Sequence, residues 1–175
     1  MITINFFGGP GSGKSTLRAG LYYEMKMQHF NVEEAPEYAK DMIFENHQNI
    51  LSDQIYMLAK QNRRISRLEG VVDYVITDSP LLLCNIYAND SLPYNEAFQQ
   101  LTVDLFNSYN NINIFINKHH SYTEIGRNET ELEAQVLSME IKDLLIDLKI
   151  HFLEFNSDEI TPKLMLEHIL KLTEK

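Results

Sequence analysis

The sequence is poor in cysteine. Cys84 is the single cysteine, so a disulfide framework and a cysteine metal site are both excluded. A chain without disulfides fits a reducing compartment, and we expect a cytoplasmic protein. With 175 residues and 44% apolar residues, the chain is expected to form one domain, residues 1–175, with its own core.

Long apolar runs are also missing. No run approaches the ~20 residues that a membrane-spanning helix needs. The first residues, MITINFF, show neither the basic region nor the cleavage site of a signal peptide. We therefore expect no membrane partner.

Positive charge is scarce. Lysine and arginine together number 15 against 25 aspartates and glutamates, which gives a formal net charge of −10. A broad surface for duplex DNA needs clustered lysine and arginine to neutralise phosphates. The charge therefore disfavours DNA as a partner, although it allows a small basic pocket.

Apolar runs and helical patterns alternate along the chain. The predicted strands cover residues 2–7, 30–35, 112–117 and 150–155, together with the run 71-VVDYVITDSP-80, which reads as a strand feeding a loop. The predicted helices cover residues 14–29, 37–47, 53–69, 93–109 and 129–149, and a last helix opens at Thr161-Pro162. This alternation predicts an α/β fold with a mostly parallel sheet of about five strands and helices on both faces.

Local signals refine these helices. Ser91 is the predicted N-cap of the helix over 93–109, with Pro93 in its first turn. The stretch 128-NETE-131 resembles a capping box at the start of the next helix. In the helix over 53–69, the predicted apolar face consists of Ile55, Leu58, Asn62 and Ile65.

Glycine is scarce as well, and its placement is informative. Four of the seven glycines lie in 8-GGPGSGKST-16, directly after the strand over 2–7. The stretch fits G-x-x-x-x-G-K-[ST], the phosphate-binding loop of three-layer P-loop NTPases. Glycines remove Cβ atoms that would keep backbone N–H groups from phosphate oxygens, and the following helix points its N-terminal donors at the same anion.

The loop is the predicted site for ATP and Mg²⁺. Lys14 is expected between the β- and γ-phosphates, the Ser15 hydroxyl on Mg²⁺, and Thr16 beside the α-phosphate. The predicted nucleotide-binding residues are Gly8, Gly9, Pro10, Gly11, Ser12, Gly13, Lys14, Ser15 and Thr16.

Three classes of P-loop protein compete for this sequence. A GTPase is disfavoured because His120, in 116-INKHH-120, stands where an aspartate reads guanine, and because Leu81 breaks the D-x-x-G motif after Asp78. A hydrolytic ATPase is disfavoured because Ser79 stands where a water-activating glutamate usually follows the strand-end aspartate. A small-molecule kinase remains.

A kinase needs carboxylates beside the phosphate loop. Asp78 ends an apolar strand at the carboxyl edge of the sheet, where it can hold Mg²⁺ through water or orient the acceptor hydroxyl. Glu37, just past the second strand, is the other candidate base. Glu34 and Asp41 are weaker candidates, and the residues leave the choice between Asp78 and Glu37 open.

A kinase also needs cations around the transferred group. The segment 118–131 lies where a lid can close over the phosphates, with Arg127 stabilising the transferred charge and Lys118 and Tyr122 assisting. Arg63 and Arg64 belong to a basic helix face that is mostly solvated, and one of them can reach the acceptor or its phosphate.

Together, the motifs FFGGPGSGKST, EAPEYAKD, YVITDSP and GRNETELEA resemble the nicotinamide-riboside-kinase-like branch of P-loop proteins. They are also similar to small phage-encoded AAA-type nucleotide kinases. The resemblance implies that Glu37 and Tyr38 line the acceptor side, that Asp78 acts on Mg²⁺ or the acceptor hydroxyl, and that Arg127 acts from the lid.

The sequence therefore predicts an ATP-dependent kinase of a nucleoside, nucleotide or nicotinamide-riboside-like small molecule. Two alternatives stay open. One is a phage kinase that acts on hydroxymethylated bases in DNA, and the other is an ATP-binding module without transfer activity.

Overall fold

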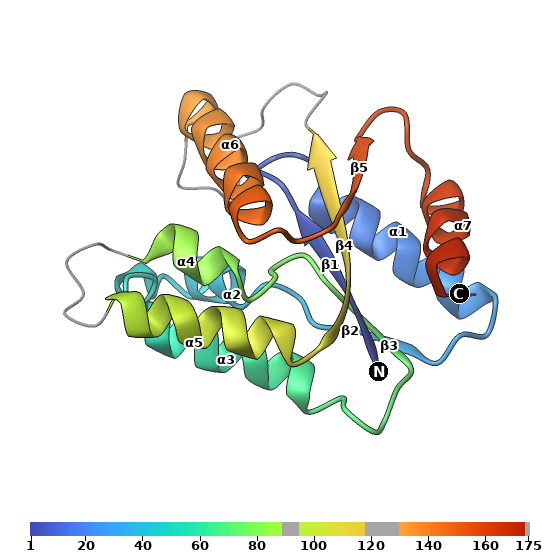
Figure 1. Ribbon diagram of the computed structural model, residues 1–175, viewed down its shortest axis with the longest axis horizontal. Coiled ribbons are helices and arrows are strands. Elements are labelled where there is room, and N and C mark those ends of the chain that lie inside the picture. The colour runs from blue at the N-terminus through green and yellow to red at the C-terminus, as the bar shows by residue number, and fades with distance from the viewer. Residues whose placement is uncertain (89–94, 118–129, 174–175) are drawn as a thin grey trace.

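The computed structural model describes residues 1–88, 95–117 and 130–173 and shows an α/β fold (Figure 1). Within these residues, one sheet of five parallel strands has the order β2-β3-β1-β4-β5. The predicted parallel sheet is confirmed. Its strands are β1 (Ile2–Phe7), β2 (Val32–Glu34), β3 (Tyr74–Thr77), β4 (Asn110–Asn117) and β5 (Leu153–Asn156).

Helices cover both faces of the sheet, as its parallel strands require. On one face, α1 (Lys14–Met27) and α7 (Pro162–Thr173) pack side by side. The short helix α2 (Tyr38–Phe44) contacts α3 and is followed by the 3-10 helix η1 (Gln48–Ile50). The other face carries α3 (Gln54–Ser66), α4 (Leu83–Tyr87), α5 (Asn95–Asn107) and α6 (Glu131–Asp147).

Side chains of β1 alternate between two cores, one on each face of the sheet. Ile4 and Phe6 belong to the core shared with α1 and α7, where they join Met165. Phe7 belongs to the opposite core and packs edge-on against Phe106 of α5 at 6.2 Å between ring centroids. These side chains are almost completely buried, and each contributes about 1.5–3 kcal/mol through the loss of apolar surface from water.

A buried asparagine cluster joins β1 to β4. Asn5 is 1% exposed, and its amide donates to the side-chain oxygens of Asn111 at 2.9 Å and Asn113 at 3.1 Å. Asn113 in turn donates to the backbone oxygen of His151 at 3.1 Å. Burial of these amides is tolerated because they are paired with one another and with backbone.

One helix was not predicted, one local prediction needs correction, and another lies outside the described residues. The short helix α4 follows Pro80 and was not expected from the apolar run 81-LLLCNIY-87. The capping box is built from Thr130 and Glu133, two residues later than predicted, because Thr130 exchanges hydrogen bonds with Glu133. The predicted cap Ser91 and Pro93 fall outside the described residues.

The predicted apolar face of α3 is wrong at two positions. Ile55 is 44% exposed and Asn62 is not part of the core, whereas Gln54 and Gln61 are buried at 6% and 3% exposure. Two glutamines therefore replace apolar residues on the inner face of this helix. Among the described helices, none is long and apolar enough to cross a bilayer.

Candidate functional site

The phosphate loop connects the carboxyl end of β1 to the first turn of α1. Several backbone positions in it require glycine, and Gly8 and Gly13 are two of them. Gly8 has a φ of 134°, and a Cβ atom there would lie 2.5 Å from the Ile116 carbonyl oxygen. Gly13 has a φ of 94° and is the N-cap of α1. The spacing of the motif therefore matches the backbone that the loop adopts.

Lys14 folds over the loop that precedes it. Its Nζ donates to the carbonyl oxygens of Gly8 at 2.7 Å and Gly9 at 2.8 Å. These contacts place an ammonium group beside the loop, at the N-terminus of a 14-residue helix whose backbone donors favour an anion. The loop backbone and the position of the lysine fit the predicted polyphosphate site, which stays a prediction.

A cavity of about 620 Å³ opens beside this loop. Ser15 and Thr16 in the first turn of α1 line it, together with Gly8, Pro10, Gly11, Gly13 and Lys14. Gly9 and Ser12 are not among the lining residues. On the other side, the cavity has a largely apolar and aromatic wall that includes Tyr38, Ile43, Phe44, Met57, Leu83 and Tyr87.

Asp78 lies at the junction of these two parts. It follows β3, lines the cavity and is only 5% exposed. Its Oδ2 lies 3.3 Å from Nε of Arg18, while its buried Oδ1 has no hydrogen-bond partner among the described residues. A buried carboxylate oxygen in this state fits a ligand that donates a hydrogen bond from the cavity.

Glu37, the second candidate base, is the N-cap residue of α2 and also lines the cavity. Its side chain does not cap the helix, so the carboxylate does not serve the helix terminus. Glu34 and Asp41 are held elsewhere, because Glu34 pairs with Arg18 and Asp41 with Arg64. The structure thus brings Asp78 and Glu37 to one cavity and leaves the two weaker candidates outside its lining.

Of the two candidate arginines on the basic face of α3, Arg64 contacts other parts of the protein. Arg64 donates to the Pro36 carbonyl at 2.9 Å, pairs with Asp41, and packs its guanidinium 5.1 Å from the centre of the Tyr38 ring. Arg63 is exposed, and neither arginine lines the cavity formed by the described residues. Arg64 therefore supports Tyr38, which does line the cavity.

The hydroxyl of Tyr38 lies 3.0 Å from that of Tyr56, and the two share a hydrogen bond. This bond raises the pKa of Tyr38 to about 12 and lowers the pKa of Tyr56 from its ordinary value. Lys60 lies 5.1 Å from the centre of the Tyr56 ring. Tyr38 thus stays protonated, and its hydroxyl oxygen can accept a hydrogen bond at the cavity edge.

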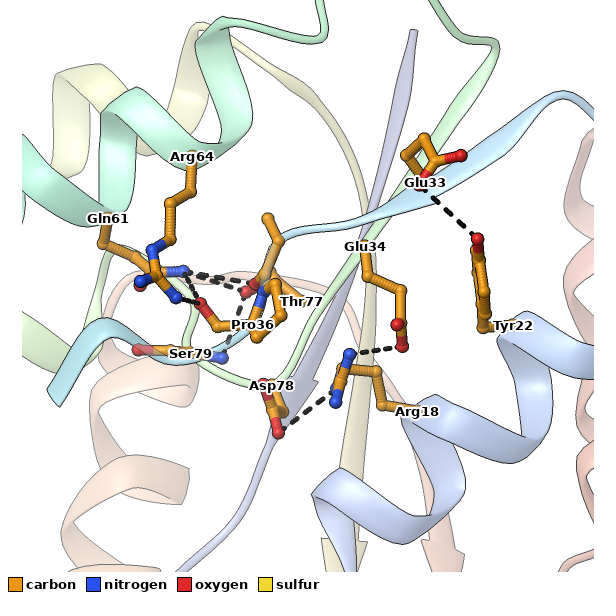
Figure 2. Close-up of polar contacts among 11 residues, drawn as sticks. Arg18, Tyr22, Glu33, Glu34, Pro36, Gln61, Arg64, Thr77, Asp78 and Ser79 are labelled. Atoms are coloured by element: carbon orange, nitrogen blue, oxygen red, sulfur yellow. Dashed lines mark hydrogen bonds and ion pairs between the residues drawn. The ribbon is translucent and has the colours of Figure 1, made fainter. Parts of the chain in front are cut away.

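Gln61 is a site residue that the sequence did not reveal. Its Oε1 accepts from the Tyr38 backbone at 3.0 Å, and its amide donates at 3.3 Å to Ala35, Pro36 and the Thr77 hydroxyl. One side chain of α3 therefore fixes both segments that carry the candidate bases (Figure 2). The signal in the sequence was a glutamine, Gln61, at a position that the helical pattern places on the inner face of α3.

Helix α4 contributes Cys84 and Tyr87 to the wall of the cavity. Cys84 is 8% exposed, and burial raises the pKa of its thiol to about 12. At neutral pH this thiol is protonated and behaves as a small apolar group.

Helix α6 lies directly against the phosphate loop. The Gly9 backbone N–H donates to the Ser138 hydroxyl at 3.3 Å, and a Cβ atom on Gly9 would lie 2.5 Å from the Ala134 carbonyl oxygen. The predicted lid, residues 118–131, precedes this helix. Arg127, Lys118 and Tyr122 lie outside the described residues, so their roles remain predictions.

The donors at this site fit a magnesium nucleotide. Ser15 supplies a hydroxyl and Asp78 a carboxylate, both in the wall of the cavity that the phosphate loop borders. Among the described residues, no three histidine, cysteine, aspartate or glutamate side chains gather into a metal site. This set suits Mg²⁺, which usually retains waters and takes phosphate oxygens with one or two protein ligands.

Many solved structures share this fold, and two illustrate it. A NadR protein in complex with NR has a TM-score of 0.67 and 19% identity, over 87% of this chain and 45% of that one. The thymidylate kinase from Ehrlichia chaffeensis has a TM-score of 0.62 and 14% identity, over 99% of this chain and 98% of that one. The chain therefore spans less than half the length of the NadR protein.

Sequence comparison identifies the family. No curated protein matches the chain significantly. The family model described as "AAA domain" matches residues 3–161, which extend from β1 to the residue before α7. Because this match includes the phosphate loop and all five strands of the sheet, the chain is a P-loop protein that belongs to the AAA domain family.

Proposed function

We propose that the protein is an ATP-dependent kinase that phosphorylates a hydroxyl group of a nucleoside-like small molecule. One observation carries the proposal: the phosphate loop and two carboxylates, Asp78 and Glu37, line the same cavity as a set of aromatic and aliphatic side chains. A kinase needs this combination, because donor phosphates and acceptor must meet in one partly enclosed space.

The chain's own groups have separate tasks in this reaction. When bound, ATP supplies the transferable phosphoryl group and Mg²⁺ neutralises its charge. Lys14 and the N-terminus of α1 bind the phosphates, and the Ser15 hydroxyl ligates the metal. Asp78 accepts a hydrogen bond inside the cavity, and Glu37 is placed to accept the proton of the acceptor hydroxyl.

The lining of the cavity favours an acceptor without a phosphate group. The charged residues among its described lining are Lys14, Lys40, Glu37 and Asp78, and none is an arginine. A nucleoside monophosphate is usually held by arginine, which binds phosphate in a bidentate manner. Aromatic side chains such as Tyr38 and Phe44 suit a planar base.

The two structural relatives agree with this range of acceptors. One holds NR, and the other is a thymidylate kinase. We propose a nucleoside rather than a nucleoside monophosphate as the acceptor, since the described lining of the cavity contains no arginine that could bind a phosphate.

The experiment is a screen for ADP release across nucleosides, nucleoside monophosphates, nicotinamide riboside and DNA with hydroxymethylated bases, with products identified by mass spectrometry. We expect one or more nucleosides to be phosphorylated. Lys14→Ala should lower turnover by at least about 100-fold, because it removes a cation that stabilises the transferred charge.

Lys26→Met is the matched control, since Lys26 lies on the same helix but forms an exposed pair with Glu33. It should retain full turnover. Nucleotide binding without a phosphorylated product from any acceptor would contradict the proposal and favour the non-catalytic module. Phosphorylation of monophosphates alone would contradict the assignment of the acceptor.

A further inference from the structure

Arg18 joins the phosphate-loop helix to both neighbouring strand ends. It lies four residues after Lys14, on the same side of α1, and its side chain is 14% exposed. Its Nη1 pairs with Oε1 of Glu34 at the end of β2, and its Nε lies 3.3 Å from Oδ2 of Asp78 after β3. Figure 2 shows the guanidinium between the two carboxylates.

The two carboxylates differ in their surroundings. Glu34 is 25% exposed, so water reaches it, whereas Asp78 is 5% exposed and faces the cavity. A buried carboxylate is costly unless a cation or hydrogen-bond donors compensate its charge. The guanidinium of Arg18 supplies this positive charge to Asp78 through Nε. Its Nη1 pairs with Glu34, which fixes the position of the group.

The contact is a one-sided ion pair, in which Nε of Arg18 forms no hydrogen bond within the described part of the chain. Arg18 approaches Oδ2 alone, and Oδ1 of Asp78 remains buried without a hydrogen-bond partner among the described residues. A buried acceptor that has no partner among the described residues can be satisfied by a donor on a bound ligand. Because Asp78 and Ser15 line the same cavity, the water shell of a magnesium ion held by Ser15 offers a donor of the right kind.

Building on the proposed kinase function, we propose that Arg18 is a positioning residue for magnesium. Its guanidinium pairs with Oδ2 of Asp78 and with Glu34, which would leave Oδ1 available to accept a hydrogen bond from a water bound to the magnesium ion. Lysine cannot do the same, because a single ammonium lacks the fixed fork that contacts two carboxylates at once.

The test measures ADP binding by calorimetry with and without Mg²⁺. Magnesium should tighten binding to the wild-type protein. Asp78→Asn and Arg18→Met should each weaken the Mg²⁺-dependent part about tenfold, as expected for groups that orient a metal's ligands. The double variant should be no weaker than Asp78→Asn alone, because Arg18 acts through Asp78.

Controls separate this role from a general loss of structure. Lys26→Met removes another ion pair between α1 and β2 and should leave the magnesium effect unchanged. Arg18→Lys keeps the charge and is expected to fold. It should weaken the Mg²⁺-dependent part of ADP binding several-fold. The proposal is overturned if Arg18→Met or Arg18→Lys keeps the full magnesium effect that Asp78→Asn loses, or if the two losses add in the double variant.

Thermal unfolding supplies a second readout that needs no ligand. Arg18→Met leaves the buried Asp78 carboxylate without its cation and should lower the Tm by roughly 5 °C. Adding Asp78→Asn to that variant should restore part of the loss, and a further drop would contradict the contact. A protein that shows both patterns yet phosphorylates no acceptor would refute the kinase proposal and leave the role of Arg18 standing.

Discussion

At the residue scale, the tyrosine pair beside the cavity has a chemical signature that can be measured. Tyr38 and Tyr56 share one hydrogen bond, which raises the pKa of Tyr38 to about 12 and lowers the pKa of Tyr56. Tyr38 therefore keeps its proton in the range between the ordinary tyrosine value of 10.0 and about 12.

Replacing Tyr56 with phenylalanine removes the partner that accepts this bond. The pKa of Tyr38 should then fall from about 12 towards 10.0, because its proton no longer gains a hydrogen bond. The measurement is an NMR titration of tyrosine labelled with ¹³C at Cζ, assigned with Tyr38→Phe. Tyr23→Phe, at a 60%-exposed position on α1, is the control and should leave the titration of Tyr38 unchanged.

The position of the loop beside the cavity could be predicted from the sequence, because the phosphate loop is a local motif whose spacing reflects its backbone. Arg18 could not. Its partners lie 16 and 60 residues further along the chain, and only the sheet order β2-β3-β1 brings them to one side chain. The candidate bases were found because each follows a strand, which places it at the shared carboxyl edge.

At the scale of elements, α3 and the two strand ends are joined by Gln61. This side chain makes four hydrogen bonds, to the Tyr38 backbone, Ala35, Pro36 and Thr77, and is 3% exposed. The helix therefore holds the segment that carries Glu37 and the segment that carries Asp78 at a fixed separation.

Gln61→Leu should destabilise the protein by about 2–3 kcal/mol, because it leaves a backbone N–H and several acceptors unpaired in a buried place. Equilibrium denaturation in urea measures the loss. Gln135→Leu, at an exposed position on α6, is the matched control. Equal effects of the two substitutions would show that Gln61 does not join the elements.

The strands and long helices were predictable because their apolar periodicities differ. The exceptions have physical causes. Helix α4 spans five residues, which is too short for a helical period to appear within an apolar run. The inner face of α3 was misread at Ile55 and Asn62 because Gln54 and Gln61 are buried through hydrogen bonds, which a hydrophobic pattern does not record.

At the scale of the whole molecule, acidic charge limits the partners of the protein. The net charge of −10 repels a phosphate backbone, while the site itself is a cavity of about 620 Å³ rather than an open track. Both features favour a small acceptor over a base within duplex DNA.

Fluorescence anisotropy with a labelled duplex of about 20 base pairs, with and without hydroxymethylated bases, tests this. At about 50 mM salt we expect no saturable binding at micromolar protein, because few lysine and arginine side chains can displace counterions. Tight binding that weakens steeply towards about 200 mM salt would restore the DNA kinase alternative.

Cys84 gives the cavity wall a built-in reporter. Its thiol lines the cavity, is 8% exposed and is protonated at neutral pH, so an added disulfide reagent should modify it slowly. A ligand that fills the cavity should slow this modification further, so its rate reports occupancy of the site. Because the chain has one cysteine, the signal comes from this place alone.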